Sequence, residues 1–185
     1  MISIKKNKYG QEMYAPGRKT IKKYIYEPGQ EMDFKLSRTK FENFLKCKRC
    51  FYLEIVRGIK EPSMPQFSLN QLTDDLLKKE FDLSRQFQIP HQIMEKNNLS
   101  HLVPFQHDDI DFWREPLRGG LQHRIGNIIL TGAPDDIWYD RQKNKVCVAD
   151  YKSQTKDSPL NELSYWNDHY HEAYKNQLDF YSYLL

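Results

Sequence analysis

Two short groups of polar residues in this chain have side chains suited to the hydrolysis of a phosphodiester. One is Pro134-Asp135, and the other is Asp150-Tyr151-Lys152. Both lie on predicted β-strands. Two carboxylates and an ammonium group at the end of a buried sheet are costly to desolvate unless a cation or a phosphate neutralises them. Together the two groups indicate a metal-dependent site that cleaves phosphodiester bonds.

Each group has a plainer interpretation when it is taken alone. An Asp-x-Lys sequence on a strand is common as an exposed ion pair at a sheet edge. Pro-Asp is commoner still, because both residues favour turns. The catalytic interpretation depends on the order of the groups along a predicted hairpin and on a third element downstream.

The local pattern predicts the strands that would position these residues. Residues 127–139 form an apolar run with a Gly-Pro interruption beside the acids, residues 140–144 predict a turn, and residues 145–152 predict the returning strand. Since side chains alternate along a strand, the acid and the lysine of the second group share one face with two valines. If the strands pair as a hairpin, Asp135 approaches Asp150.

The third element is an amphipathic helix predicted over residues 174–185. Tyr174, Gln177 and Tyr181 are spaced by three and four residues, so they lie on one face of this helix. Such a stripe is compatible with core packing that has a tyrosine rim. It is equally compatible with an amide and a phenol held against a nucleic-acid backbone or against the lysine.

In this order, the motifs Gly132-x-x-Asp135, Asp150-Tyr151-Lys152 and Gln177-x-x-x-Tyr181 resemble the PD-(D/E)XK nuclease superfamily, specifically its RecB-like branch. Residues Leu36 to Leu53 are similar to the opening helix of that branch. The resemblance as a whole covers roughly Leu36 to Leu185. Roughly residues 85–125 match no feature of the branch.

The resemblance implies an α/β (α+β) fold with a restriction-endonuclease-like core, in which helices flank a mixed central β-sheet. It implies a DNA nuclease with Mg²⁺ as the cofactor, for which Mn²⁺ would substitute. In this pattern Asp135, Asp150 and the backbone carbonyl of Tyr151 bind the ion. Lys152 orients the attacking water or stabilises charge on the phosphoryl oxygens. The choice between endonuclease and exonuclease stays open.

The resemblance also gives roles to the polar residues around this centre. Gln177 and Tyr181 would position the lysine or the DNA strand without taking part in the chemistry. Asp136 competes with Asp135 for the metal position, and we prefer Asp135 because it matches the Gly-x-x-Asp spacing of the family.

Asp74 is a further candidate metal ligand. A helix predicted over residues 69–88 places it on the same face as Leu77 and Phe81. In the family pattern this helix often carries a histidine or an acid near the metal. It has no histidine here, so Asp74 would stand in for one. The alternative is an acid on the helix surface among other charged residues.

The cysteines allow two interpretations. Cys47-x-x-Cys50 has a spacing that elsewhere binds zinc or an iron–sulfur cluster. In the cluster-containing relatives three more cysteines follow the Gln-x-x-x-Tyr helix, and this sequence lacks them. We therefore predict no iron–sulfur cluster and reduced cysteines, with Cys147 on a strand within the core. The alternative is a metal-stabilised interaction domain organised around Cys47 and Cys50.

The chain is predicted to have two parts. Residues 1–35 form a basic arm. Within its first 25 residues, seven lysines and arginines oppose a single acid, and such an arm is either disordered or lies along phosphates. Residues 36–185 form the nuclease-like domain. Ser37 or Thr39 caps a first helix that runs to about Arg57.

Composition restricts the class of protein only loosely. The net charge of +3 does not by itself identify a nucleic-acid-binding protein, and the 14% of aromatic residues predicts an aromatic-rich core. Residues 89–118 are rich in loop-forming residues, and a strand is predicted over residues 121–125. The sequence has no apolar run of the ~20 residues that a membrane span needs and no signal-peptide core. We expect a soluble, cytoplasmic protein.

The expected partners are DNA and a helicase or a repair or recombination protein, with no membrane. The rival function is a catalytically inactive nucleic-acid-binding module that acts through such a partner. The last helix ends without a capping residue, which predicts a truncated or minimal chain. Its apolar residues would then be exposed and allow self-association. They are Phe180, Tyr183, Leu184 and Leu185.

Overall fold

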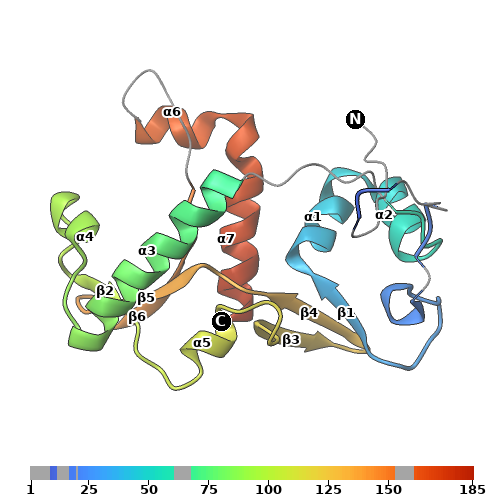
Figure 1. Ribbon diagram of the computed structural model, residues 1–185, viewed down its shortest axis with the longest axis horizontal. Coiled ribbons are helices and arrows are strands. Elements are labelled where there is room, and N and C mark those ends of the chain that lie inside the picture. Colours follow the sequence, from blue (N-terminus) through green and yellow to red (C-terminus); the bar gives the residue numbers. More distant parts are fainter. Residues whose placement is uncertain (1–8, 12–16, 20, 61–67, 153–160) are drawn as a thin grey trace. The chain divides into compact units, whose positions relative to one another are not determined.

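The computed structural model describes residues 9–11, 17–19, 21–60, 68–152 and 161–185 (Figure 1). It is an α+β protein, which confirms the predicted class. The chain divides into two compact units. Unit 1 comprises residues 1–66 and 124–130, and unit 2 comprises residues 67–123 and 131–185. The predicted domain boundary at residue 35 stays a prediction.

The strands of the described residues belong to two three-stranded sheets, where a single central sheet was predicted. The first sheet has the order β1-β4-β3 and the second the order β2-β5-β6. Their bounds are β1 Phe34–Ser37, β2 Leu102–Pro104, β3 Leu121–Ile125, β4 Ile128–Gly132, β5 Asp136–Asp140 and β6 Lys145–Ala149. The strand predicted over residues 127–139 is broken at residues 133–135. Because Pro134 has no N–H to donate to a ladder, the two halves join different sheets.

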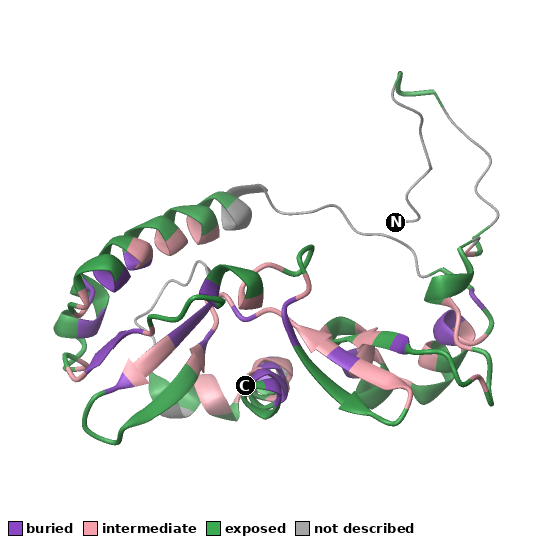
Figure 2. Ribbon diagram, turned by 90° about the horizontal axis from the view of Figure 1, so that it is seen from below, coloured by how far each residue is buried: buried purple, intermediate pink, exposed green. Residues whose placement is uncertain are grey.

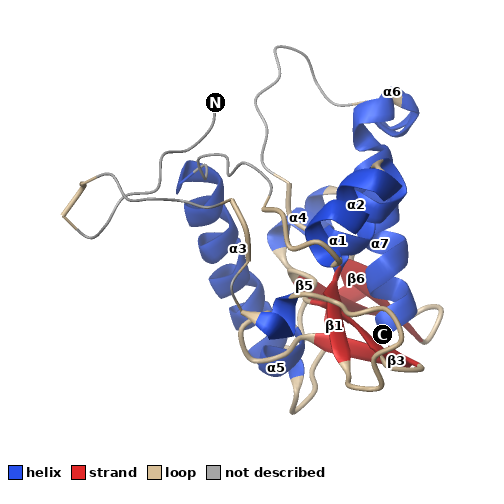
Figure 3. Cartoon of the chain, turned by 90° about the vertical axis from the view of Figure 1, so that its right-hand side faces the viewer, coloured by secondary structure: helices blue, strands red, loops and turns tan. Residues whose placement is uncertain are grey.

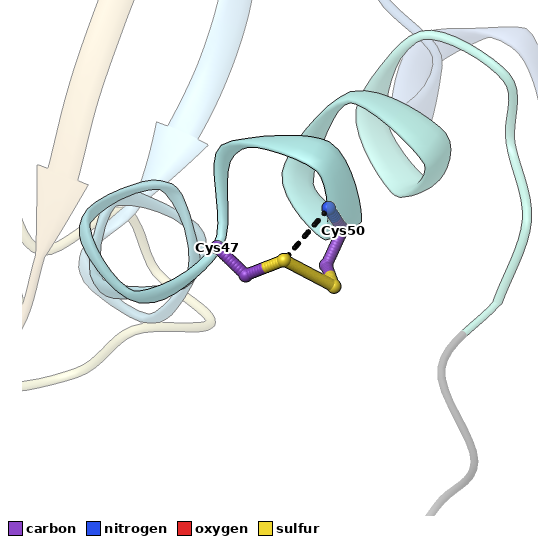
Figure 4. The surroundings of a disulfide bond; sticks show 2 residues. All are labelled: Cys47 and Cys50. Carbon is purple, nitrogen blue, oxygen red and sulfur yellow. Dashed lines mark hydrogen bonds between the residues drawn. A yellow bond between two sulfur atoms is a disulfide. The ribbon is translucent and has the colours of Figure 1, made fainter.

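In unit 1 the segment predicted as one helix from Ser37 or Thr39 to Arg57 forms two helices. They are α1, Arg38–Lys46, and α2, Lys48–Ile55, and a 3₁₀ turn η1 spans Lys22–Tyr24. The break is at Cys47, whose backbone is extended with φ −155°. Its Sγ accepts a hydrogen bond from Cys50 N at 3.2 Å and so caps α2 (Figure 4).

The described part of the predicted basic arm is hydrogen-bonded to the end of α2. Lys19 N donates to Gly58 O at 2.7 Å, and Tyr26 N donates to Ile55 O at 2.8 Å. Lys19 Nζ also lies 3.1 Å from the carboxylate of Glu54, which is buried. At least one of the basic residues is therefore part of an internal ion pair in unit 1.

Unit 2 consists of the β2-β5-β6 sheet and its helices. The helices are α3 Ser68–Phe87, α4 Gln92–Lys96, α5 Ile110–Trp113, α6 Glu162–Asn167 and α7 Glu172–Leu184, with a 3₁₀ turn η2 at His169–His171. Helix α3 contacts β2 and helix α7 contacts β6, so the β5–β6 hairpin lies between these two helices (Figure 3). Strand β2 falls in the segment predicted as loop-rich, and α3 agrees with the predicted helix.

The core of unit 2 lies between α3 and the sheet. Phe81, Met94 and Leu102 are buried there, and Trp138 and Tyr151 pack against them. The opposite face of α3 is exposed and turns away from the hairpin (Figure 2). The face of α3 that carries Leu77 and Phe81 is thus the one that faces the core.

Three predictions about exposed and membrane-spanning residues can be compared with the structure. Phe180 and Leu184 are buried, so only Tyr183 and Leu185 of the predicted apolar patch on α7 are exposed. Cys147 is exposed on β6 and is not a core residue. Among the residues that the structure describes, no helix has the length and apolar character needed to cross a membrane.

Candidate active site

The β5–β6 hairpin brings Asp135 and Asp150 together at its open end. The strands are antiparallel with Asp136 opposite Ala149, so Asp135 and Asp150 are the next two residues in register. The Oδ2 atom of Asp135 accepts a hydrogen bond from the backbone N–H of Tyr151 at 2.7 Å. This hydrogen bond holds the carboxylate of Asp135 beside Tyr151, the residue that follows Asp150. The hairpin predicted from the sequence is confirmed.

Both oxygens of Asp150 have a side-chain partner. Lys152 Nζ forms an ion pair with Oδ2. Gln177 Nε2, from α7, donates to Oδ1 at 2.6 Å. Lys152 Nζ also lies 3.5 Å from the carbonyl oxygen of Tyr151, the predicted backbone ligand. Strand β6 ends at Ala149 and not at residue 152 as predicted, so Asp150, Tyr151 and Lys152 directly follow it. The Asp-Tyr-Lys segment and the Gln-x-x-x-Tyr helix therefore meet at Asp150.

Tyr181 contacts both Gln177 and the Gly132-x-x-Asp135 segment. Its hydroxyl lies 3.4 Å from Gln177 Nε2, and its ring is buried. A Cβ at Gly132 would lie 2.6 Å from Cε1 of this ring. Gly132 has no positive φ, so its backbone would accept any residue. The glycine is needed for the space that Tyr181 fills.

Helix α3 adds a second pair of charges to the site. Lys78 Nζ lies 3.4 Å from Oδ1 of Asp135. The pKa of Asp74 is raised, first by burial and then by the charge of Asp135, although Lys78 and Lys152 oppose the shift. Asp74 is thus within electrostatic reach of Asp135. Sequence reasoning missed Lys78, although it is four residues after Asp74 and on the same helical face.

Asp136, the rival metal ligand, belongs to a buried network of its own. It is fully buried and accepts hydrogen bonds from Arg85 Nη2 at 2.5 Å and from Tyr151 Oη at 3.1 Å. Trp138 Nε1 donates at 3.2 Å, and Arg114 lies 3.6 Å away. Burial and the charge of Asp136 raise the pKa of Tyr151. Two arginines neutralise Asp136 from inside the protein, which favours a structural role.

The two consecutive acids hold Tyr151 at both ends. Asp135 binds its backbone N–H and Asp136 binds its hydroxyl. The ring of Tyr151 also stacks on Phe81 of α3, with the ring centroids 5.4 Å apart. Arg85 was missed by sequence reasoning because its partner is 51 residues away in the chain. The backbone carbonyl of Tyr151 is therefore firmly positioned.

The oxygen atoms at the hairpin end are of the type that Mg²⁺ binds. Hard oxygen donors are provided by the carboxylates of Asp135 and Asp150 and by the backbone carbonyl of Tyr151. Lys78 lies against Asp135, and Lys152 lies against Asp150. Within the described ranges, no group of three or more His, Cys, Asp and Glu residues is arranged to hold a metal ion. A site here would therefore depend on few protein ligands and on several waters, as magnesium sites commonly do.

The Cys47 and Cys50 pair is not reduced as predicted. The two residues are joined by a disulfide (Figure 4). Metal ligation by cysteine requires the thiolate, so the disulfide form offers no sulfur ligand for zinc or an iron–sulfur cluster. The helix break at Cys47 was not predicted from the periodicity of the sequence.

No family model, curated protein or solved structure matches this chain. The site is therefore defined by its own residues. These are Asp135, Asp150, Lys152, Gln177 and Tyr181, with Asp74 and Lys78 beside them.

Proposed function

We propose that this protein is a Mg²⁺-dependent nuclease of the PD-(D/E)XK type, RecB-like branch, that hydrolyses phosphodiester bonds in DNA. One observation carries the proposal. Asp135, Asp150 and Lys152 converge at the open end of the hairpin, and Gln177 of α7 binds Asp150 directly. Residues from three separate sequence motifs make direct contacts there. Short motifs that occur in one sequence only by chance have no reason to meet in the folded protein.

Each side chain has a definite task in this proposal. The carboxylates of Asp135 and Asp150 and the carbonyl of Tyr151 hold Mg²⁺, which Mn²⁺ can replace. The bound ion supplies positive charge near the scissile phosphate and lowers the pKa of its water. Asp74, which interacts electrostatically with Asp135, would be a further ligand. Lys78 balances the charge of Asp135, from which it lies 3.4 Å away.

Lys152 and Gln177 fix the geometry of the reacting groups. Lys152 Nζ, which lies against Asp150, orients the attacking water or stabilises the charge that grows on the phosphoryl oxygens. Electrostatic stabilisation of this kind is worth several kcal/mol in a shielded site, on the order of 3 kcal/mol per donor. Gln177 holds one carboxylate oxygen of Asp150, and Tyr181 supports Gln177 from the next turn of α7.

The test is cleavage of single-stranded, duplex and flapped DNA with Mg²⁺, with Mn²⁺ and with a chelator. The Asp150→Asn and Lys152→Ala variants should each lose cleavage by at least about 100-fold while retaining most of their affinity for DNA, because phosphate contacts elsewhere dominate affinity. Matched controls are Asp179→Asn on α7 and Lys79→Ala on α3, both exposed. These controls should cleave like the original protein.

The possible results separate the two candidate functions. Near-normal cleavage by either site variant would contradict the assignment. Metal-independent DNA binding with no cleavage under any condition would favour the rival function, a catalytically inactive module. Circular and end-labelled substrates then separate endonuclease from exonuclease action. We propose that the natural partner is a helicase or a repair protein, and that any self-association of α7 uses the exposed Tyr183 and Leu185.

A further inference from the structure

A cluster of aromatic rings lies beside the proposed catalytic residues in unit 2. We call it the aromatic ladder and define it as Tyr165, Trp166, His171 and Tyr174. The rings of Tyr165 and His171 stack at 3.9 Å with an interplanar angle of 20°, and those of His171 and Tyr174 at 5.3 Å with 18°. Trp166 meets Tyr165 edge-on at 5.1 Å. The ladder thus joins α6, η2 and the start of α7.

The ladder is connected to the site at one end and to a second lysine at the other. Lys152 Nζ lies over the ring of Tyr174, 5.3 Å from its centroid. Lys175 Nζ lies 5.9 Å from the centroid of the Trp166 ring and donates to the Trp166 carbonyl at 2.5 Å. An ammonium group is therefore held close to the ring at each end of the ladder.

The rings are fixed from within but are not fully covered. His171 is buried, and its Nδ1 lies 2.7 Å from the carbonyl oxygen of Tyr165. Tyr165, Trp166 and Tyr174 are only partly buried. Aromatic rings that are already ordered and partly exposed bind a flat ligand at little further cost in side-chain entropy.

We infer that this ladder is a base-stacking subsite for an unpaired nucleotide of the DNA strand that is cut, with Trp166 as the ring that receives the base. The inference rests on the proposed nuclease function and adds a recognition element to it. Stacking on aromatic rings is worth about 1–3 kcal/mol per base and works for any sequence, because every base has a π-face.

The position of the ladder restricts which nucleotide it can bind. The path from Lys152 Nζ to Trp166 covers 5.3 Å to the centroid of the Tyr174 ring, 6.5 Å from there to the Tyr165 centroid and 5.1 Å on to the Trp166 centroid. At 3.4 Å per stacked nucleotide, this path corresponds to at most about five nucleotides. The bound base therefore belongs to the few nucleotides that flank the scissile phosphate. Paired bases in a duplex cannot reach the rings, so the subsite favours single-stranded or frayed DNA.

The experiment compares two ligands and measures binding in the presence of a chelator, so that cleavage plays no part. One ligand is a short oligothymidylate, and the other is an abasic strand of the same length and charge. Anisotropy titrations use the full chain, Trp166→Ala, Trp166→Phe, and Phe87→Ala as the control. Phe87 is an exposed aromatic residue on α3, outside the ladder.

We expect Trp166→Ala to weaken oligothymidylate binding by about 5- to 150-fold and abasic binding by less than about twofold. Trp166→Phe should retain most of the affinity, and Phe87→Ala should change neither. Equal losses for both ligands, or no loss for either, would overturn the inference, because the ring would then act only through folding or not at all. If the protein cleaves DNA but binds both ligands with the same dependence on Trp166, the stacking inference fails and the nuclease proposal stands. If the dependence differs but no DNA is cleaved, only the nuclease proposal fails.

Discussion

Replacement of Gly132 by alanine would test how the Gly-x-x-Asp segment and the Gln-x-x-x-Tyr helix fit together. The new Cβ would lie 2.6 Å from Cε1 and 2.9 Å from Cδ1 of Tyr181, and 3.2 Å from Cδ1 of Leu184. Both neighbours are buried, so neither can rotate freely into solvent. The ring has to withdraw by about 0.8 Å to reach an ordinary contact distance of 3.4 Å.

The expected cost follows from two opposing effects. Overpacking of this kind destabilises proteins by about 1–3 kcal/mol. Replacing glycine by alanine in a strand without a clash would instead stabilise by roughly 0.5–1 kcal/mol. We expect a net loss of about 1–2 kcal/mol in the free energy of unfolding. The midpoint should fall by about 2–4 °C per kcal/mol for a chain of this size.

Thermal and denaturant unfolding of Gly132→Ala, Tyr181→Leu and the double variant form a mutant cycle that isolates the clash. If the Tyr181 ring occupies the space above Gly132, the two substitutions should couple by at least about 0.5 kcal/mol, with the double variant more stable than the sum predicts. A single Gly132→Ala variant that is as stable as the original protein would refute the reasoning. Because Tyr181 supports Gln177, the same variant should also cleave DNA more slowly.

The other predictions address charge and the disulfide. Asp136→Ala should lower the free energy of unfolding by about 3–5 kcal/mol in denaturant titrations, because Arg85 and Arg114 lose their buried counterion and keep only the more exposed carboxylates of Asp82 and Asp111, and a loss below about 1 kcal/mol would contradict the network. Asp74→Asn should raise the stability of the metal-free protein at pH 7 by up to about 1 kcal/mol. Ionised Asp74 is destabilising because its pKa is raised, so the gain should be absent below the ordinary value of 3.8 and should grow as the pH rises through the raised pKa. An equal gain at every pH would argue against this cause. Replacing Cys47 and Cys50 by serine should cost at most about 2 kcal/mol for so short a loop and leave metal content and cleavage unchanged, whereas loss of a bound metal would favour the rival metal-stabilised domain.

The sequence alone determined the elements that depend on neighbouring residues. Alternation of apolar residues and a polar turn gave the β5–β6 hairpin, and helical spacing gave α3 and α7 within a few residues of their bounds. The same local spacing placed Gln177 and Tyr181 on one face of α7. Short-range sterics and periodicity decide these features, and both can be read in a window of ten to twenty residues.

Tertiary structure alone decided which polar groups meet. The sequence indicated the interruption at Pro134, but not that the two halves join different sheets, and it did not indicate the break at Cys47 between two helices. The distinction between the two neighbouring acids is of the same kind. Asp136 is neutralised by arginines that lie far away in the sequence, whereas Asp135 faces the end of the hairpin. Long-range contacts of this type depend on the free energy of the whole packed unit, which no local pattern contains.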